Sequence, residues 1–452
     1  MDQAADFAAR IAAGEKAVAA GRAAAAIALA QGLLADGCHA VDVVVFHARA
    51  LDLAGQPEAA LALLADALTL HPDSGRLRVE RGKILARQGD VIRAEAAYDD
   101  ALTHDPRQLE AVKGLLALHP LSLDDPRLER VAEVAMDRDR PASKRAKAFY
   151  ILGQVWLEAG ETDPAMAFYA QANALMAEGH DPAALEYRFA SGAFDITREV
   201  LTRHARRTML PPRCPALLIA GLPRSGKTLA EQLLCRGDAV HPGGELAILS
   251  RFSRELDWSQ GGAAVVARFD ALTSSPLAPR YLAAAEGRRF VTDTSPPTLF
   301  RLGVMGALHP DVPVVLCHRD PLDLAAAMWV KQFRRGNLFT TRLDTLGRAI
   351  ARAERMAAHW LDSLPNPVLH LAYEETATDP DGTAVRLAAL AGLPPPRRPE
   401  ARPPARLHPA RSGDGPPGPG LIGFARPLSR HLEPAMAAYR AERDRLLQVR
   451  PR

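Results

Sequence analysis

Residues 215–232 read PALLIAGLPRSGKTLAEQ, and this stretch decides the fold of the second half of the chain. The apolar run 216–220 predicts a buried strand, and the turn 221–226 ends it before an amphipathic helix begins at Lys227. The two glycines of the turn allow the backbone to approach an oxyanion closely. The first turn of the helix supplies free N–H groups and the positive end of the helix dipole. The stretch therefore predicts a phosphate-binding loop, in which Arg224, Lys227 and Thr228 add side-chain donors.

Gly221 to Thr228 also fits the pattern G-x-x-x-x-G-K-[ST] of nucleotide triphosphatases. This eight-residue match leaves open a P-loop kinase or NTPase. Such an enzyme needs an acidic residue after a strand to hold Mg²⁺, and Asp293 is the candidate.

Composition narrows the class of protein. The 452 residues predict two or three domains, and 48% apolar with 24% charged residues is typical of a globular protein. We expect no transmembrane segment, because no apolar run is long enough, and no signal peptide, because the start lacks a basic end followed by an apolar core. A cytoplasmic location is the resulting expectation.

Charge and cysteine content set further expectations. A formal charge of +3 is too small to indicate a nucleic-acid partner or a membrane surface. The four cysteines lie far apart, without a C-x-x-C pair or a histidine at ligand spacing, so we expect reduced thiols and no metal. They are Cys38, Cys214, Cys235 and Cys317.

The first hundred residues repeat with a period of 34. Gly21, Gly55 and Gly89 are each 34 apart, and so are Pro72 and Pro106. This period is typical of tetratricopeptide helix-turn-helix units, in which a glycine ends the first helix and a proline follows the second. Residues 1–112 are therefore predicted to form an α-solenoid of such repeats.

Residues 113–213 are expected to form an irregular helical segment, a further repeat and bridging helices. Prolines interrupt the register after 113, and one helix is predicted at 128–136. The repeat pattern resumes over about 148–173. Residues 174–213 are interpreted as a helical bridge.

Residues 214–452 follow a different pattern. Strand-like runs at 216–220, 289–292, 312–317 and 367–372 alternate with helical stretches, which predicts an α/β domain with a central parallel sheet. Ligands of such sheets bind beyond the carboxyl ends of the strands, where the glycine turn, Asp293 and Arg319 fall. The segment 393–420, rich in Pro, Arg and Gly, is predicted to be an extended or mobile loop, and a last helix is predicted at 428–447.

The glycine turn and its flanks resemble a known family. Pro223 to Leu229, followed by Glu231 to Leu234 and by Gly244-Glu245-Leu246, are similar to the 5′-phosphosulfate loop of sulfotransferases that use 3′-phosphoadenosine 5′-phosphosulfate (PAPS). The resemblance is to the bacterial type that contains tetratricopeptide repeats and to its tyrosylprotein sulfotransferase relatives. It implies a sulfotransferase fold and a 5′-phosphosulfate site made by Arg224, Ser225, Gly226, Lys227, Thr228 and Leu229.

The same resemblance assigns two more residues. Residues 314–323, VVLCHRDPLD, resemble the family's 3′-phosphate element, which implies that Arg319 binds the 3′-phosphate of the nucleotide. Ala327 stands where the family usually has a serine. Glu245 lies 21 residues after Arg224, the separation that the resemblance implies for the general base, and His241 is a weaker candidate for that role.

The sequence also departs from the family. Relatives commonly read Asp-Lys-x-Pro-x-Asn where this chain has Asp293 to Thr298, so Thr294 replaces the lysine assigned to leaving-group stabilisation. Our hypothesis is that Lys227 supplies this cation from the loop itself.

Three functions are consistent with these observations. The first is transfer of a sulfuryl group from PAPS to a hydroxyl or amine, with a peptide or protein acceptor bound through the repeats. The second is a P-loop kinase or NTPase. The third is a catalytically inactive scaffold that acts through its repeats. This hypothesis is based on Thr294 and Ala327, which stand where the family usually has a lysine and a serine.

Overall fold

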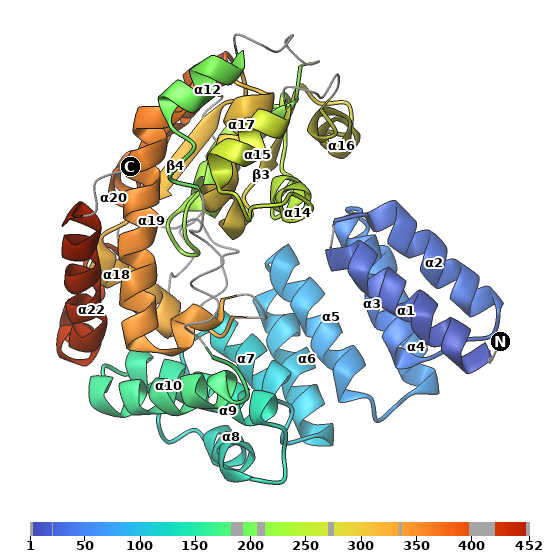
Figure 1. The fold of residues 1–452 in the computed structure, drawn as a ribbon. Coiled ribbons are helices and arrows are strands. Elements are labelled where there is room, and N and C mark those ends of the chain that lie inside the picture. Colours follow the sequence, from blue (N-terminus) through green and yellow to red (C-terminus); the bar gives the residue numbers. More distant parts are fainter. Residues whose placement is uncertain are drawn as a thin grey trace. The chain divides into compact units, whose positions relative to one another are not determined.

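The computed structural model describes residues 3–19, 21–181, 193–205, 213–269, 275–333, 337–396 and 421–448. The chain divides into two compact units, Met1–Ala172 and Asn173–Arg452, each with its own hydrophobic core (Figure 1). Most of the predicted loop 393–420 and parts of the predicted bridge 174–213 lie outside the described residues.

The first unit begins with the predicted repeats. Its first three helix pairs are α1 (Gln3–Ala19) with α2 (Ala23–Ala35), α3 (Val41–Leu53) with α4 (Pro57–Leu70), and α5 (Gly75–Gln88) with α6 (Val91–His104). Gly21, Gly55 and Gly89 follow the first helix of each pair with φ of 72°, 76° and 83°. This left-handed conformation favours glycine and explains the 34-residue spacing.

Small residues allow the helices to pack closely around Tyr98. A Cβ atom on Gly82 of α5 would lie 2.6 Å from the Tyr98 ring, and one on Gly114 would lie 2.3 Å from it. Gly114 belongs to α7 (Leu109–Leu118), so Tyr98 of α6 fills the space between two neighbouring helices. α7 was not predicted as a helix, because it spans the point near residue 113 where the 34-residue pattern is lost.

The last helices of the first unit include the one predicted at 128–136. This helix is α8 (Arg127–Met136), and α9 (Ala142–Glu158) and α10 (Thr162–Ala177) form the next pair. Gly153 lies against Tyr169, where a Cβ would come within 2.9 Å of the ring. The rings of Phe149 and Phe168 are 6.2 Å apart.

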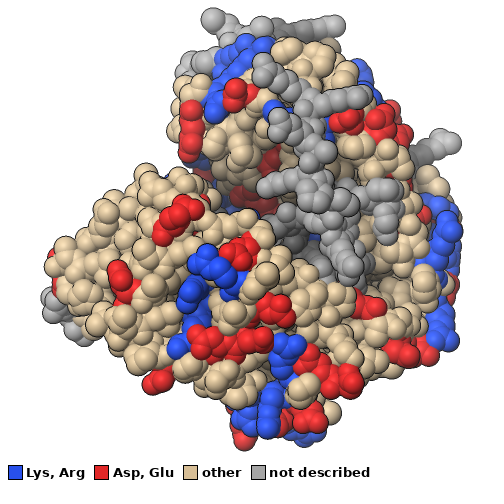
Figure 2. Space-filling model, turned by 180° about the vertical axis from the view of Figure 1, so that it is seen from behind, with Lys and Arg blue, Asp and Glu red and all other residues tan. Residues whose placement is uncertain are grey.

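Ion pairs join helices within and between the repeats. Arg49 of α3 donates to the buried carboxylate of Glu80 on α5 at 2.7 Å, and Arg78 donates to Asp100 at 2.6 Å. On the face drawn in Figure 2, the acidic and basic side chains of the described residues are interspersed.

The second unit contains a five-stranded parallel sheet in the order β2-β3-β1-β4-β5. The strands are β1 (Ala216–Ala220), β2 (Val240–His241), β3 (Phe290–Asp293), β4 (Val314–His318) and β5 (Val368–Ala372). Four of the five were predicted to within two residues at each end, which confirms the expected combination of an α-solenoid with an α/β domain. β2 was not predicted, since it has only two residues.

Helices and 3₁₀ turns surround this sheet (Figure 1). Every residue of β1 is buried, and Leu217 and Ile219 pack with α13 and α21 in one apolar cluster. The elements are α12 (Arg198–Ala205), α13 (Lys227–Leu234), α14 (Ile248–Arg254), α15 (Gly262–Arg268), α16 (Leu277–Ala284), η2 (Pro296–Arg301), α17 (Leu302–Leu308), α18 (Pro321–Trp329), η3 (Leu338–Thr341), α19 (Leu343–Ser363), α20 (Tyr373–Thr378), α21 (Pro380–Leu390), η5 (Arg426–Leu428) and α22 (Ser429–Gln448).

The helix predicted at 428–447 is present as α22, which packs against α19. Among the described residues, no helix combines the length and the apolar character needed to cross a bilayer.

Candidate functional site

The turn between β1 and α13 has the conformation expected of an anion-binding loop. Gly221 has a φ of 156°, and a Cβ there would lie 2.5 Å from the carbonyl oxygen of Cys317 on β4. Gly226 caps α13 with a φ of 99°, and Arg224 has the unusual φ of 70° for a residue with a side chain. The loop thus requires glycine at both ends and holds Arg224 in a costly conformation, as is common at functional sites.

Hydrogen bonds fix the shape of this loop. The hydroxyl of Ser225 donates to the carbonyl of Leu222 at 2.8 Å. The Lys227 ammonium donates to the carbonyls of Gly221 at 2.9 Å and of Leu222 at 3.4 Å. The lysine therefore lies under the turn and ties its two sides together.

Burial changes the charge equilibrium of Lys227. Removal of the ammonium from water lowers the pKa of Lys227 to about 8, although the negative charges of Glu245 and Asp293 act in the opposite direction. Lys227 is thus a buried cation, and an arriving phosphate or sulfate group would stabilise its charge.

The next two predicted ligands differ in exposure. Thr228 is exposed on the first turn of α13, whereas the side chain of Leu229 is buried in the core. Only the backbone N–H of Leu229 is therefore suited to an anion.

Arg319 follows β4 and is almost fully buried, with 4% of its surface exposed. Its guanidinium lies over the rings of Tyr373 at 4.2 Å and Phe424 at 5.4 Å. One nitrogen, Nη2, donates to the carbonyl of Leu421 at 2.7 Å, while Nε has no hydrogen-bond partner among the described residues. A buried donor without a partner is costly, so this nitrogen is suited to bind an anion.

Arg224 and Arg319 are neighbours. The Nη1 atom of Arg319 lies 3.5 Å from the carbonyl oxygen of Arg224. Burial lowers the pKa of Arg224, and the positive charge of Arg319 lowers it further. Both groups remain protonated at neutral pH, and the buried Asp323 carboxylate lies 4.0 Å from the Arg319 guanidinium. Two cations and one nearby anion therefore lie where β1 and β4 end.

A short segment near the end of the chain covers Arg319. The Asp323 carboxylate accepts the backbone N–H groups of Gly423 at 2.6 Å and Ala425 at 3.1 Å. This places Leu421 and Phe424 against Arg319. Sequence analysis missed the roles of Asp323 and Phe424, because no local pattern marks a contact between residues about a hundred positions apart.

The predicted base, Glu245, is exposed on the loop after β2. Its neighbour Gly244 donates to the Glu231 carboxylate at 2.9 Å and accepts from the N–H of Thr294 at 2.8 Å. The Thr292 hydroxyl also donates to Glu231. Glu231 of α13 thereby connects the loop that carries Glu245 to the helix that begins at Lys227. His241 ends β2 and lies 3.8 Å from the exposed Glu286 carboxylate.

The positions that depart from the family pattern are buried. Asp293 accepts hydrogen bonds from the Tyr281 hydroxyl at 2.9 Å and from the N–H and hydroxyl of Ser295 at 3.1 and 2.6 Å. Thr294 is 5% exposed, and the Thr298 hydroxyl is buried without a partner among the described residues. Ala327 is fully buried in α18.

A parallel sheet with a glycine turn after its first strand and two arginines at the strand ends is typical of α/β domains that bind phosphate-bearing ligands. Residues 215–397 match the model of the sulfotransferase family, and residues 53–118 match a tetratricopeptide repeat model. The chain therefore contains a sulfotransferase-family domain together with tetratricopeptide repeats, which confirms the resemblance drawn from the sequence.

Two individual proteins are similar to the chain. An uncharacterized protein of Aquifex aeolicus (strain VF5) is 25% identical over 276 residues, which cover 56% of this chain and 35% of the relative. The match thus spans about a third of the length of that relative. The crystal structure of the P58(IPK) TPR domain covers 98% of this chain and 100% of its own at 12% identity. Its TM-score of 0.22 is too low to inform the fold.

Proposed function

We propose that this protein transfers a sulfuryl group from PAPS to a hydroxyl or amine acceptor. The observation that carries the proposal is the adjacency of Arg224 and Arg319 at the ends of neighbouring strands. PAPS bears a phosphosulfate on one side of its ribose and a phosphate on the other, so it needs two cationic positions within one nucleotide's reach.

The residues present fit this donor. The N–H groups at the start of α13, with Arg224, Ser225, Gly226, Lys227 and Thr228, are suited to the 5′-phosphosulfate. Arg319 is suited to the 3′-phosphate, since its Nε has no other partner among the described residues.

Sulfuryl transfer breaks the bond between sulfur and the phosphate oxygen and forms one between sulfur and the acceptor oxygen or nitrogen. The electron pair of the broken bond stays on the phosphate oxygen, and the acceptor loses a proton. In this proposal Lys227 stabilises the charge on the leaving oxygen and Glu245 accepts the proton. The negative charge of Glu245 opposes the lowering of the Lys227 pKa, which supports the assignment of both groups to one site.

Lys227 takes the role of the missing lysine in this proposal. Thr294 has no charge, whereas Lys227 is a buried cation at the start of α13. The proposed reaction requires no metal. The acceptor is proposed to be a peptide or protein recruited by the repeats, because tetratricopeptide units commonly form extended binding surfaces.

The alternative of a P-loop kinase or NTPase depends on Asp293 as a magnesium ligand. Three hydrogen-bond donors already surround this carboxylate, which disfavours that role. The alternative of an inactive scaffold is based on the absence of the family's lysine at Thr294 and serine at Ala327. A measurement of activity distinguishes a scaffold from an enzyme.

The test is transfer of labelled sulfate from PAPS to a panel of hydroxyl and amine acceptors that includes tyrosine peptides. We expect the wild type to be active and Lys227→Ala to lose activity. The double variant Lys227→Ala/Thr294→Lys should regain part of it, because the cation returns at the family's usual position. A wild type that transfers sulfate to no acceptor would overturn the proposal.

A further inference from the structure

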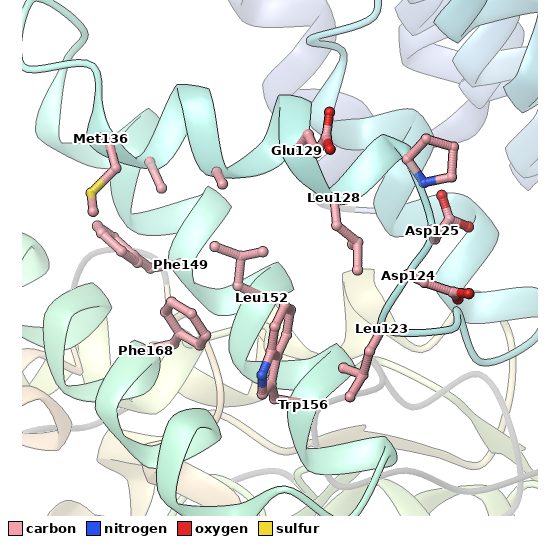
Figure 3. A pocket seen from close by; sticks show the side chains of 13 residues that line it. Leu123, Asp124, Asp125, Leu128, Glu129, Met136, Phe149, Leu152, Trp156 and Phe168 are labelled. Atoms are coloured by element: carbon pink, nitrogen blue, oxygen red, sulfur yellow. The ribbon is translucent and has the colours of Figure 1, made fainter.

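A groove of about 400 Å³ lies between α8 and α10, with side chains of α9 forming its floor (Figure 3). Phe149, Leu152 and Trp156 come from α9, and Phe168 comes from α10. The Trp156 and Phe168 rings are 5.3 Å apart, edge to face. We call this the α8–α10 groove.

The apolar surface of the groove is open to solvent. Met136, at the end of α8, is 71% exposed, and Leu123, before α8, is 40% exposed. Trp156 and Phe168 are only partly buried, although large aromatic side chains bury readily in a core. Methionine and aromatic side chains that stay exposed in a concave site adapt readily to a bound partner.

The groove has one charged end. Its lining includes three carboxylates, Asp124, Asp125 and Glu129, and no lysine or arginine. They lie near Leu123 and Leu128, whereas Met136, Phe149 and Phe168 form the other end (Figure 3). Asp125 is paired with Arg127 at 2.7 Å, but Glu129 forms no ion pair within the described part of the chain. A ligand therefore meets an apolar end and an acidic end.

The groove is separate from the surface formed by the first helices of the repeats. Helices α1, α3, α5, α7 and α9 contact one another in succession. The groove instead opens between α8 and α10, which follow α7 and α9 as the second helices of their pairs. It is thus a second possible binding surface of the first unit.

We propose that the α8–α10 groove binds an extended or helical segment of a partner protein that carries an apolar or aromatic side chain a few residues from a lysine or arginine. The apolar side chain fills the end made by Phe149, Phe168 and Met136. The basic residue pairs with Glu129 and Asp124. We base this assignment on charge complementarity, since the carboxylates at the acidic end repel acidic segments and attract basic ones. It does not depend on sulfuryl transfer.

The experiment uses the full chain and a phage library of random peptides of about twelve residues. Selection on the wild type, with counter-selection on Glu129→Lys, should enrich peptides that combine Arg or Lys with Leu, Phe or Trp. Fluorescence anisotropy then measures the affinity of each enriched peptide.

The peptide affinities of two groove variants and one control variant are compared with that of the wild type. Glu129→Lys and Met136→Glu should each weaken binding about tenfold or more, the former by repulsion and the latter by loss of apolar contact. Both side chains are exposed, so neither variant should unfold the unit. Asp73→Lys reverses an exposed acidic residue outside the groove and should leave the affinity within about twofold.

Three results would overturn the proposal. One is enrichment of acidic or uncharged peptides, or of none. Another is equal binding to the groove variants and the wild type. The third is a dimer in sedimentation analysis that Met136→Glu dissociates, since a second copy of the chain would then be the occupant.

Discussion

The guanidinium of Arg319 lies 3.5 Å from the backbone carbonyl of Arg224, although 95 residues separate them in sequence. The contact exists because β1 and β4 are neighbours in the sheet and both strands end at the same edge. It brings the glycine turn and the start of α18 into one site.

Arg319→Ala should weaken binding of 3′-phosphoadenosine 5′-phosphate by about tenfold to a hundredfold, since a charge-assisted hydrogen bond contributes about 1.5–3 kcal/mol. Affinity for adenosine 5′-phosphosulfate, which lacks the 3′-phosphate, should change much less. The matched control is Arg289→Ala. Arg289 lies just before β3, at the end of the sheet where the strands begin, whereas Arg319 lies at the end where they finish. Equal losses for both nucleotides would contradict a 3′-phosphate role for Arg319.

Glu245→Gln should lower the rate of sulfate transfer by about a hundredfold to ten-thousandfold, the usual contribution of a general base. Nucleotide affinity should stay nearly constant, because Glu245 is assigned to the acceptor and not to the donor. Glu255→Gln, an exposed glutamate after α14, serves as the control. An unchanged rate for Glu245→Gln would exclude Glu245 as the base and favour His241.

The rate at low substrate concentration, kcat/KM, should fall as the pH rises through about 8. The pKa of Lys227 is lowered to about 8 in the free protein, so its cation is present below this pH and lost above it. A bound phosphosulfate stabilises the cation, so the corresponding fall in kcat should occur at higher pH. The limb of the kcat/KM profile near pH 8 should disappear in Lys227→Arg if that variant retains activity, since arginine stays protonated.

Lys227→Met should abolish sulfate transfer, remove the cost of a buried charge and lose the hydrogen bonds to the carbonyls of Gly221 and Leu222, so its stability relative to the wild type should depend on pH. The ordinary pKa of lysine is 10.5, and burial lowers that of Lys227 to about 8, so the folded state is penalised by up to about 3 kcal/mol below pH 8. Methionine removes the charge and keeps most of the volume. The stabilisation that results from removing this charge should shrink between about pH 8 and 10.5, where the lysine of the wild type becomes neutral in the folded state. Differential scanning calorimetry of both proteins at pH 7 and 10 measures it, and a difference in stability between variant and wild type that is the same at both pH values would contradict the interpretation.

Sequence patterns predicted those parts that depend on short-range information. The repeats were evident because Gly21, Gly55 and Gly89 must each adopt a left-handed conformation after a helix. β1 and the turn after it were evident because a buried strand needs an apolar run and an anion-binding turn needs glycine.

Long-range contacts could not be predicted in the same way. The covering of Arg319 by Leu421, and the support of Gly423 by Asp323, join residues about a hundred positions apart. The anchoring of the Glu245 loop by Glu231 depends on the meeting of α13 with the end of β3. The α8–α10 groove was missed because Phe149 and Phe168 look like ordinary core residues in the sequence.

Titration calorimetry of the wild type with 3′-phosphoadenosine 5′-phosphate, in the presence of a metal chelator, tests whether Arg224 and Arg319 together bind one nucleotide. We expect saturable binding of one nucleotide per chain, lost when Arg224 and Arg319 are both replaced by alanine. Binding of MgATP but not of this nucleotide, or binding of neither, would contradict this expectation.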